Sequence, residues 1–220
     1  MGLWRDGAVI GRPGADTRSH AERLPLEAEA FLAEHGCTFA DIDRFVVVSG
    51  PGSFTGLRVG VAAVQGWAFA LNRPVTTVGS LEALVEAMTP LSTEVAETTL
   101  IVPCLDGLRG EVFFGAWWQG TALRAADVGA PAQAIEVVQA LLPAGATVAI
   151  TGDGASRYAE VWAGAGWRTC ASRLTLAEAA ARLAAQPGAA AMVPHAVRPN
   201  YVRRSDAEVV RDRKQGVIRP

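Results

Sequence analysis

Charge and cysteine are both scarce in this chain, and each scarcity excludes a class of protein. Only 19% of the 220 residues are charged, the formal net charge is −2, and Lys214 is the only lysine. Half of the residues are hydrophobic, which is the balance of a folded globular protein rather than of a disordered one. The small net charge gives no global reason to expect nucleic-acid binding.

The few cysteines and histidines predict no metal site and no disulfide framework. Cys37, Cys104 and Cys170 are widely separated and odd in number, and the chain contains no Cys-x-x-Cys pair. We therefore expect reduced thiols, as in the cytoplasm. The three histidines are isolated, and none has a second ligand at helical spacing.

The chain also lacks a long apolar run and a signal-peptide pattern. The longest uncharged apolar stretch, residues 59–71, is too short to span a bilayer. The first residues, MGLWRDGAVIG, do not read as basic and then apolar. We expect a cytoplasmic protein without a membrane segment.

Short β-branched runs alternate with helical patterns, which predicts an α/β fold. Strands are expected at residues 8–10, 45–48, 74–78, 99–105, 111–118 and 147–151, and helices at 19–35, 53–71, 80–88, 132–142 and 174–186, with a further helix after the turn at 152–154. Gly36 is expected to end the first helix, and Pro25 to kink it or to form a separate first turn. Thr175 and Glu178 have the spacing of a capping box. Residues 90–98 are polar and aperiodic. They predict a boundary between two lobes, 1–96 and 97–220, of which the second ends in a basic tail.

The most unusual segment is SGPGSFTGLRVGVAAVQGWAFAL, residues 49–71, with five glycines. A P-loop would need a lysine here, and a dinucleotide fingerprint would need glycine at Thr55. A nucleophile elbow would need glycines where Pro51 and Thr55 flank Ser53. Because all three patterns fail, we predict a sharp turn followed by a helix that Ser53 caps.

This helix is apolar nearly all round, since Arg58 is its only charged residue. Such a helix is expected to be buried nearly all round. Gly56, Gly60 and Ala63 form a smooth strip that would let another backbone approach closely. Packing on the chain's own sheet explains one face only, so the pattern favours a partner protein on the other face.

Two aspartates are the remaining candidates for chemistry. Asp106 follows a buried strand, at the place where α/β proteins hold ligands, but an aspartate there also serves turns by bonding to its own backbone. Asp153, between two glycines, has the same two interpretations. No Ser–His–Asp set can be assembled from the sequence.

Several segments together resemble the TsaB (YeaZ) family. They are SHAERLPL, GPGSFTGLRVG followed by VTTVGSLEAL, LDGLRGEVFF and RPNYVRRSDAE, and the resemblance covers nearly the whole chain. It implies the two-lobed fold of the actin, sugar-kinase and Hsp70 (ASKHA) superfamily. It also implies a non-catalytic subunit in the synthesis of threonylcarbamoyladenosine, next to the anticodon of tRNAs that read A-starting codons.

The resemblance further implies the partners and the surface that binds them. The partners are a TsaD-like catalytic subunit, which carries the metal, a TsaE-like ATPase, and tRNA through the complex. The family's contact with TsaD uses the first two helices, and the chain alone could pair with itself through the same surface. The corresponding interface residues here are Leu24, Ala28, Phe31, Leu32, Phe54, Gly56, Gly60, Ala63, Val64 and Trp67.

No cofactor and no catalytic or metal-binding residue is implied for this chain. The metal-binding His-x-x-x-His of TsaD would start at His20 and is broken by Leu24. Family members also begin with a strand that ends in Asp-Thr and forms a phosphate loop. We expect a first lobe without that strand, through truncation or a misassigned start. If the protein has this length, the missing loop disfavours nucleotide binding by this subunit alone.

Two alternatives stay open. One is a small ATP-dependent kinase or hydrolase of the same superfold, centred on Asp106. The other is a freestanding RNA-binding module that uses the basic tail. The missing lysine and Asp-Thr loop count against the first, and the acidic net charge counts against the second.

Overall fold

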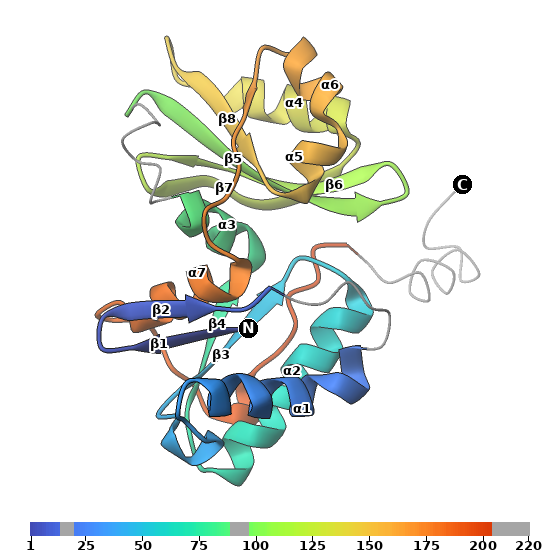
Figure 1. The fold of residues 1–220 in the computed structure, drawn as a ribbon. Coiled ribbons are helices and arrows are strands. Elements are labelled where there is room, and N and C mark those ends of the chain that lie inside the picture. The colour runs from blue at the N-terminus through green and yellow to red at the C-terminus, as the bar shows by residue number, and fades with distance from the viewer. Residues whose placement is uncertain (14–19, 89–96, 204–220) are drawn as a thin grey trace, which may run out of the picture.

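The computed structural model describes residues 1–13, 20–88 and 97–203. Most of the predicted boundary at 90–98 lies outside these ranges, as do Ser19 and the basic tail beyond Arg203. The chain forms an α/β fold in two parts, stacked one above the other in Figure 1. We call them the five-stranded part and the N-terminal part. The predicted division into lobes 1–96 and 97–220 stays a prediction, with the amendment given below for one helix.

The five-stranded part is a mixed sheet with the strand order β7-β6-β5-β8-β9. Its strands are β5 (Thr99–Leu108), β6 (Glu111–Trp118), β7 (Thr121–Gly129), β8 (Thr147–Thr151) and β9 (Arg168–Thr169). β5, β6 and β7 form an antiparallel meander, whereas β8 and β9 run parallel to β5. The helices α4 (Pro131–Leu141), α5 (Asp153–Arg157) and α6 (Ala159–Gly164) complete this part, and Trp162 and Val138 from them join the core of the sheet.

The N-terminal part holds two separate two-stranded sheets. The antiparallel hairpin of β1 (Gly2–Arg5) and β2 (Ala8–Gly11) forms one, and the parallel pair of β3 (Phe45–Gly50) and β4 (Val75–Gly79) forms the other. The helices α1 (His20–Glu34), α2 (Phe54–Ala70) and α3 (Ser80–Met88) follow β2, β3 and β4 in turn. α2 covers one face of the β3-β4 pair through Val61 and Val64, and α3 covers the other.

The two parts share one order of elements, with a difference at the centre. In the five-stranded part, the hairpin strand β6 and the strand β8 both pair with β5. The corresponding strands of the N-terminal part are β1 and β3, and among the described residues no strand lies between them. The strand that the sequence analysis expects to be missing from the first lobe would lie here, between β1 and β3.

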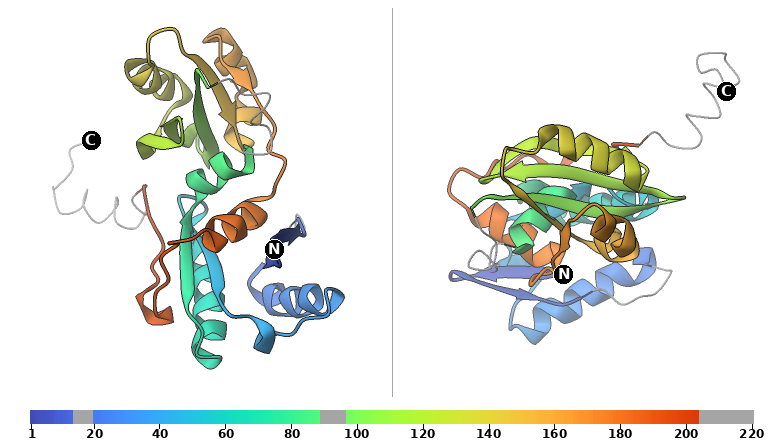
Figure 2. Two further views of the ribbon diagram at one scale, coloured as in Figure 1. Left: turned by 90° about the vertical axis from the view of Figure 1, so that its left-hand side faces the viewer. Right: turned by 90° about the horizontal axis from the view of Figure 1, so that it is seen from above.

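α3 joins the two parts by packing on both (Figures 1 and 2). Leu81 and Leu84 on one side of α3 pack with Trp117 of the five-stranded sheet. Ala83 and Ala87 on the other side pack with the β3-β4 pair. A helix with two apolar sides is expected at such a junction.

The assignment of residues 174–186 to the second lobe was wrong. This helix, α7 (Leu176–Ala185), packs against α3, β1 and β3 of the N-terminal part. Its Ala179 and Ala180 are buried beside Val78, and Arg182 pairs with Glu86 of α3 at 3.0 Å. An amphipathic pattern shows that one face is buried but not which part of the chain buries it.

The predicted cap of α7 is confirmed and carries a measurable stability. Thr175 Oγ1 accepts from Glu178 N at 3.2 Å, and Glu178 Oε2 accepts from Thr175 N at 2.8 Å. We expect Thr175→Ala to lower the free energy of unfolding by about 1 kcal/mol, because it removes both bonds of Thr175 Oγ1, which accepts from Glu178 N and donates to Glu178 Oε2. Urea unfolding measures this, and an unchanged midpoint would show that the cap contributes nothing.

Other helix ends also agree with the sequence. Gly36 ends α1 with φ +66°, and Cys37 N donates to Leu32 O at 2.9 Å, which is a Schellman motif. Ser53 caps α2 by accepting from Gly56 N at 3.3 Å. Of the two outcomes considered for Pro25, a kink or a separate first turn, neither divides the helix, since Pro25 lies inside a continuous α1.

The sequence reading missed β7 and the break between α5 and α6. Most residues of β7 are exposed, so this edge strand shows no hydrophobic alternation.

Among the described residues, no helix is both long and apolar enough to cross a membrane.

Candidate functional site

The outer face of α2 is the strongest candidate for a binding surface. We define it by five residues at helical spacing, Thr55, Val59, Ala62, Gly66 and Phe69, all of them exposed or half-buried. None is charged, and Phe69 exposes 76% of its surface. A helix face of this composition in contact with water is unusual, because apolar faces are normally covered.

The opposite side of α2 is held by the chain itself. Val61, Val64 and Ala68 are buried in one cluster with Phe45 and Val47 of β3. The prediction that this helix is buried nearly all round is therefore correct for one side only within this chain. The outer face stays exposed in this chain.

The ten predicted interface residues fall into three groups by exposure, and their role stays a prediction. Ala28, Phe31, Leu32 and Val64 are buried by the chain's own core. Leu24, Ala63 and Trp67 are half-buried, and Trp67 packs on Phe39 and Phe45. Phe54 and Gly56 are exposed, and the half-buried Gly60 has no atom within 4 Å of the position that a Cβ would take.

α1 adds to the exposed apolar area beside α2. The two helices are in contact, and Figure 1 shows α1 lying across α2. Leu26 on α1 exposes 68% of its surface, and Ala30 and Ala33 are exposed as well. Sequence reasoning missed Leu26, Phe69, Ala62 and Gly66, because a helical pattern does not show which of its positions the core of the chain covers.

At the first turn of α2, two aromatic side chains and one guanidinium gather. Arg58 lies over the Phe54 ring at 4.0 Å, and its Nε donates to the hydroxyl of Tyr201 at 3.0 Å. The rings of Phe54 and Tyr201 lie 4.8 Å apart. The single charge of α2 is thus engaged at one end and leaves the outer face uncharged.

The structure brings the two candidate aspartates together. Asp153 Oδ1 accepts from Asp106 N at 2.9 Å, and Asp106 Oδ1 accepts from Leu108 N at 3.0 Å. Asp106 Oδ2 also lies 3.5 Å from Arg157. These bonds are those of a turn aspartate, the second of the two interpretations that the sequence left open.

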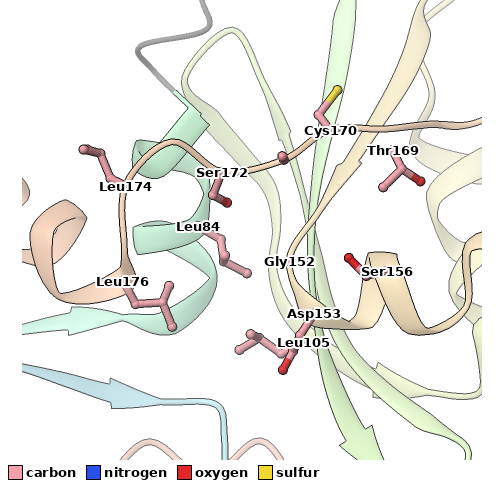
Figure 3. Close-up of a pocket in the computed structure, with 11 residues that line it drawn as sticks. Leu84, Leu105, Gly152, Asp153, Ser156, Thr169, Cys170, Ser172, Leu174 and Leu176 are labelled. Carbon is pink, nitrogen blue, oxygen red and sulfur yellow. The ribbon is translucent and has the colours of Figure 1, made fainter. Parts of the chain in front are cut away.

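A cavity of about 430 Å³ lies beside these aspartates, between α3, the start of α7 and α5 (Figure 3). It is lined by leucines, among them Leu84 and Leu105, and its polar members include Asp153, Ser156, Thr169 and Ser172. The lining contains no lysine or arginine, so it offers no cation to a phosphate group. In the described part of the chain, no three His, Cys, Asp or Glu side chains gather closely enough to hold a metal ion.

The cysteines differ in their exposure, and this has a measurable consequence. Cys104 is buried, and burial raises the pKa of its thiol far above the usual value, whereas Cys37 and Cys170 are half-buried. Because the thiolate is the reactive form, we expect two thiols to react with Ellman's reagent at pH 8 in the native protein. All three should react in 6 M guanidinium, and a third rapid thiol in the native protein would contradict the structure.

These features define a mixed α/β protein with an apolar helix face that the chain leaves exposed. The family model described as TsaD, tRNA N6-adenosine threonylcarbamoyltransferase, matches residues 12–198, and the chain belongs to this family. The resemblance to TsaB and YeaZ is confirmed by the relatives and solved structures that follow.

Curated relatives match over part of their length. An uncharacterized protein of Mycobacterium tuberculosis (strain H37Rv) is 40% identical over 116 residues, 52% of this chain and 51% of the relative. The tRNA threonylcarbamoyladenosine biosynthesis protein TsaB of Haemophilus influenzae is 30% identical over 134 residues, 56% of this chain and 55% of the relative. The chain spans about half the length of the curated relatives that it matches.

Solved structures match over nearly the whole chain. An uncharacterized protein with similarity to peptidase YeaZ from Pseudomonas aeruginosa has a TM-score of 0.71 at 26% identity, covering 92% of this chain and 93% of that chain. YeaZ from the same organism has a TM-score of 0.68 at 26% identity, covering 91% and 92%. The mixed α/β fold is therefore the fold of these proteins.

Proposed function

We propose that this chain is a non-catalytic subunit that binds and activates a TsaD-like protein in the synthesis of threonylcarbamoyladenosine in tRNA. The observation that carries the proposal is the uncharged outer face of α2, which the chain itself leaves uncovered. Family membership supplies the context, since two relatives are named as TsaB proteins of this biosynthesis. A TsaE-like ATPase and tRNA enter through the complex, and the two-lobed ASKHA arrangement is part of the same proposal.

The arrangement of the aspartates supports a non-catalytic role. Asp106 and Asp153 are both engaged by backbone N–H groups of the chain, and the neighbouring cavity presents no cation. A kinase or hydrolase of this superfold would need groups that hold a nucleotide's phosphates and its metal. This alternative therefore has less support than the partner-binding role.

Reconstitution tests the proposal. We expect threonylcarbamoylation of tRNA by the TsaD-like and TsaE-like proteins of the same organism to require this chain, with threonylcarbamoyl-adenylate as donor. The chain alone should show no ATP hydrolysis above the rate of a buffer control. Equal modification with and without the chain would refute the proposal, and ATP hydrolysis by the chain alone would favour the kinase or hydrolase alternative.

A further inference from the structure

The segment that follows α7 runs back along the N-terminal part and is firmly attached to it. Met192 and Val75 exchange backbone hydrogen bonds of 2.8 and 2.9 Å. Gln65 of α2 donates to the carbonyls of Pro194 and Val197 at 2.9 and 3.2 Å. Val197 is 1% exposed and belongs to the core under α2. The position of this segment is therefore set by the N-terminal part.

The next residues pass the carboxyl end of β3. Asn200 N donates to Ser49 O at 2.7 Å, and the Asn200 carbonyl lies against the position that a Cβ at Gly50 would take. Gly50 has φ +127°, a conformation that glycine adopts readily. The close approach and the backbone conformation both require glycine at this point.

Two side chains then hold different parts of the molecule. Tyr201 contacts Phe54 and Arg58 at the first turn of α2. Arg203 reaches the β5-β6 turn of the five-stranded part, where it donates to Gly107 O at 2.7 Å and pairs with Glu111 at 3.0 Å. Residues two apart in an extended chain span about 7 Å, so a very short segment connects the two parts here.

The two parts are thus joined at two places of different strength. The junction at α3 is apolar and deeply buried, with Leu81 at 1% and Leu84 at 5% exposure. At the other junction, the side chains of Arg203 and Glu111 are 34% and 41% exposed. Apolar burial of the first kind is strong, whereas an ion pair open to solvent is weak and sensitive to salt. The contact at Arg203 is therefore the one that releases first.

We propose that Arg203 is a latch, which holds the β5-β6 turn to the N-terminal part and whose release lets the five-stranded part rotate about α3. Tyr201 lies two residues away and contacts the first turn of α2. When the Arg203 contact forms, it therefore also holds Tyr201 against Phe54 and Arg58. This inference concerns the chain alone and stands or falls independently of the TsaD-like partner.

Distances between spin labels on the two parts test the latch. Ala70→Cys on α2 and Gln139→Cys on α4 place labels at exposed positions of the two parts, in a Cys37→Ser, Cys170→Ser background that keeps the buried Cys104. We expect Arg203→Ala to increase the population at longer distance by about fivefold, the upper end of what a solvent-exposed ion pair contributes. Glu111→Gln should act in the same direction with a smaller effect.

The control is Arg124→Ala, which removes an equally exposed ion pair, with Asp127 at 3.3 Å, within β7. It should leave the distances unchanged. A second measurement needs no further substitution in the labelled chain. Raising NaCl from 0.05 to 1 M should increase the population at longer distance, as Arg203→Ala does, because salt screens the ion pair. Distances that respond neither to salt nor to Arg203→Ala, or that respond equally to Arg124→Ala, would overturn the latch.

Discussion

Gly66→Glu, on the outer face of α2, is expected to weaken binding of the TsaD-like partner by at least about 100-fold while the chain stays folded. An unpaired charge buried in an interface costs about 3–5 kcal/mol, of which the lower end already corresponds to a factor of 100. The fold should tolerate the change, because Gly66 is exposed and, apart from the helix's own backbone, no atom lies within 4 Å of its Cβ position. Glutamate also forms helices better than glycine by several tenths of a kcal/mol.

The chain offers a matched control for this variant. Gly164, the last residue of α6, is exposed and likewise has no atom within 4 Å of its Cβ position. Gly164→Glu adds the same side chain and charge to the five-stranded part, far along the chain from α2. Isothermal titration calorimetry should show a large loss of affinity for Gly66→Glu only. Equal affinities for both variants would remove α2 from the interface.

Trp162→Ala is expected to lower the free energy of unfolding by about 3–5 kcal/mol, the usual cost of removing a buried tryptophan. Trp162 is fully buried, stacks on Trp167 with ring centroids 5.5 Å apart, and donates from Nε1 to Gly154 O at 3.2 Å. Its removal leaves a cavity between α6 and the five-stranded sheet. The total free energy of unfolding of a typical domain is only about 5–15 kcal/mol. The loss should therefore be evident in urea unfolding.

Trp4→Ala is the control for this second prediction. Trp4 lies on the β1-β2 hairpin and exposes 40% of its surface, so it should lose less than about 1 kcal/mol. If Trp162→Ala costs no more than Trp4→Ala, the packing described for α6 is wrong.

The sequence predicted most of the secondary structure but not how its elements are shared between the two parts. Local signals such as the Thr175 capping box and Gly36 depend on neighbours in the sequence, and they were read correctly. The partner of α7 depends on contacts with residues about a hundred positions away, which no local pattern encodes. β7 was missed because an exposed edge strand has no apolar face to mark it.

The binding surface, too, was predicted only in part. Composition indicated that α2 carries more apolar surface than one sheet can cover. It did not show which residues the sheet covers, because Val64 and Phe69 are both apolar and only packing makes the first buried and the second exposed. Likewise, the two interpretations of Asp106 were distinguished only by the positions of Leu108 N and Asp153.

The central claim is that this chain pairs with a TsaD-like protein through α2. Size-exclusion chromatography with light scattering, on an equimolar mixture of the chain and the TsaD-like protein of its own organism, tests it most directly. The account predicts a single species whose mass is the sum of the two chains, and two separate species again when Gly66→Glu replaces the wild type. Separate elution of the wild-type proteins at micromolar concentration would contradict the account.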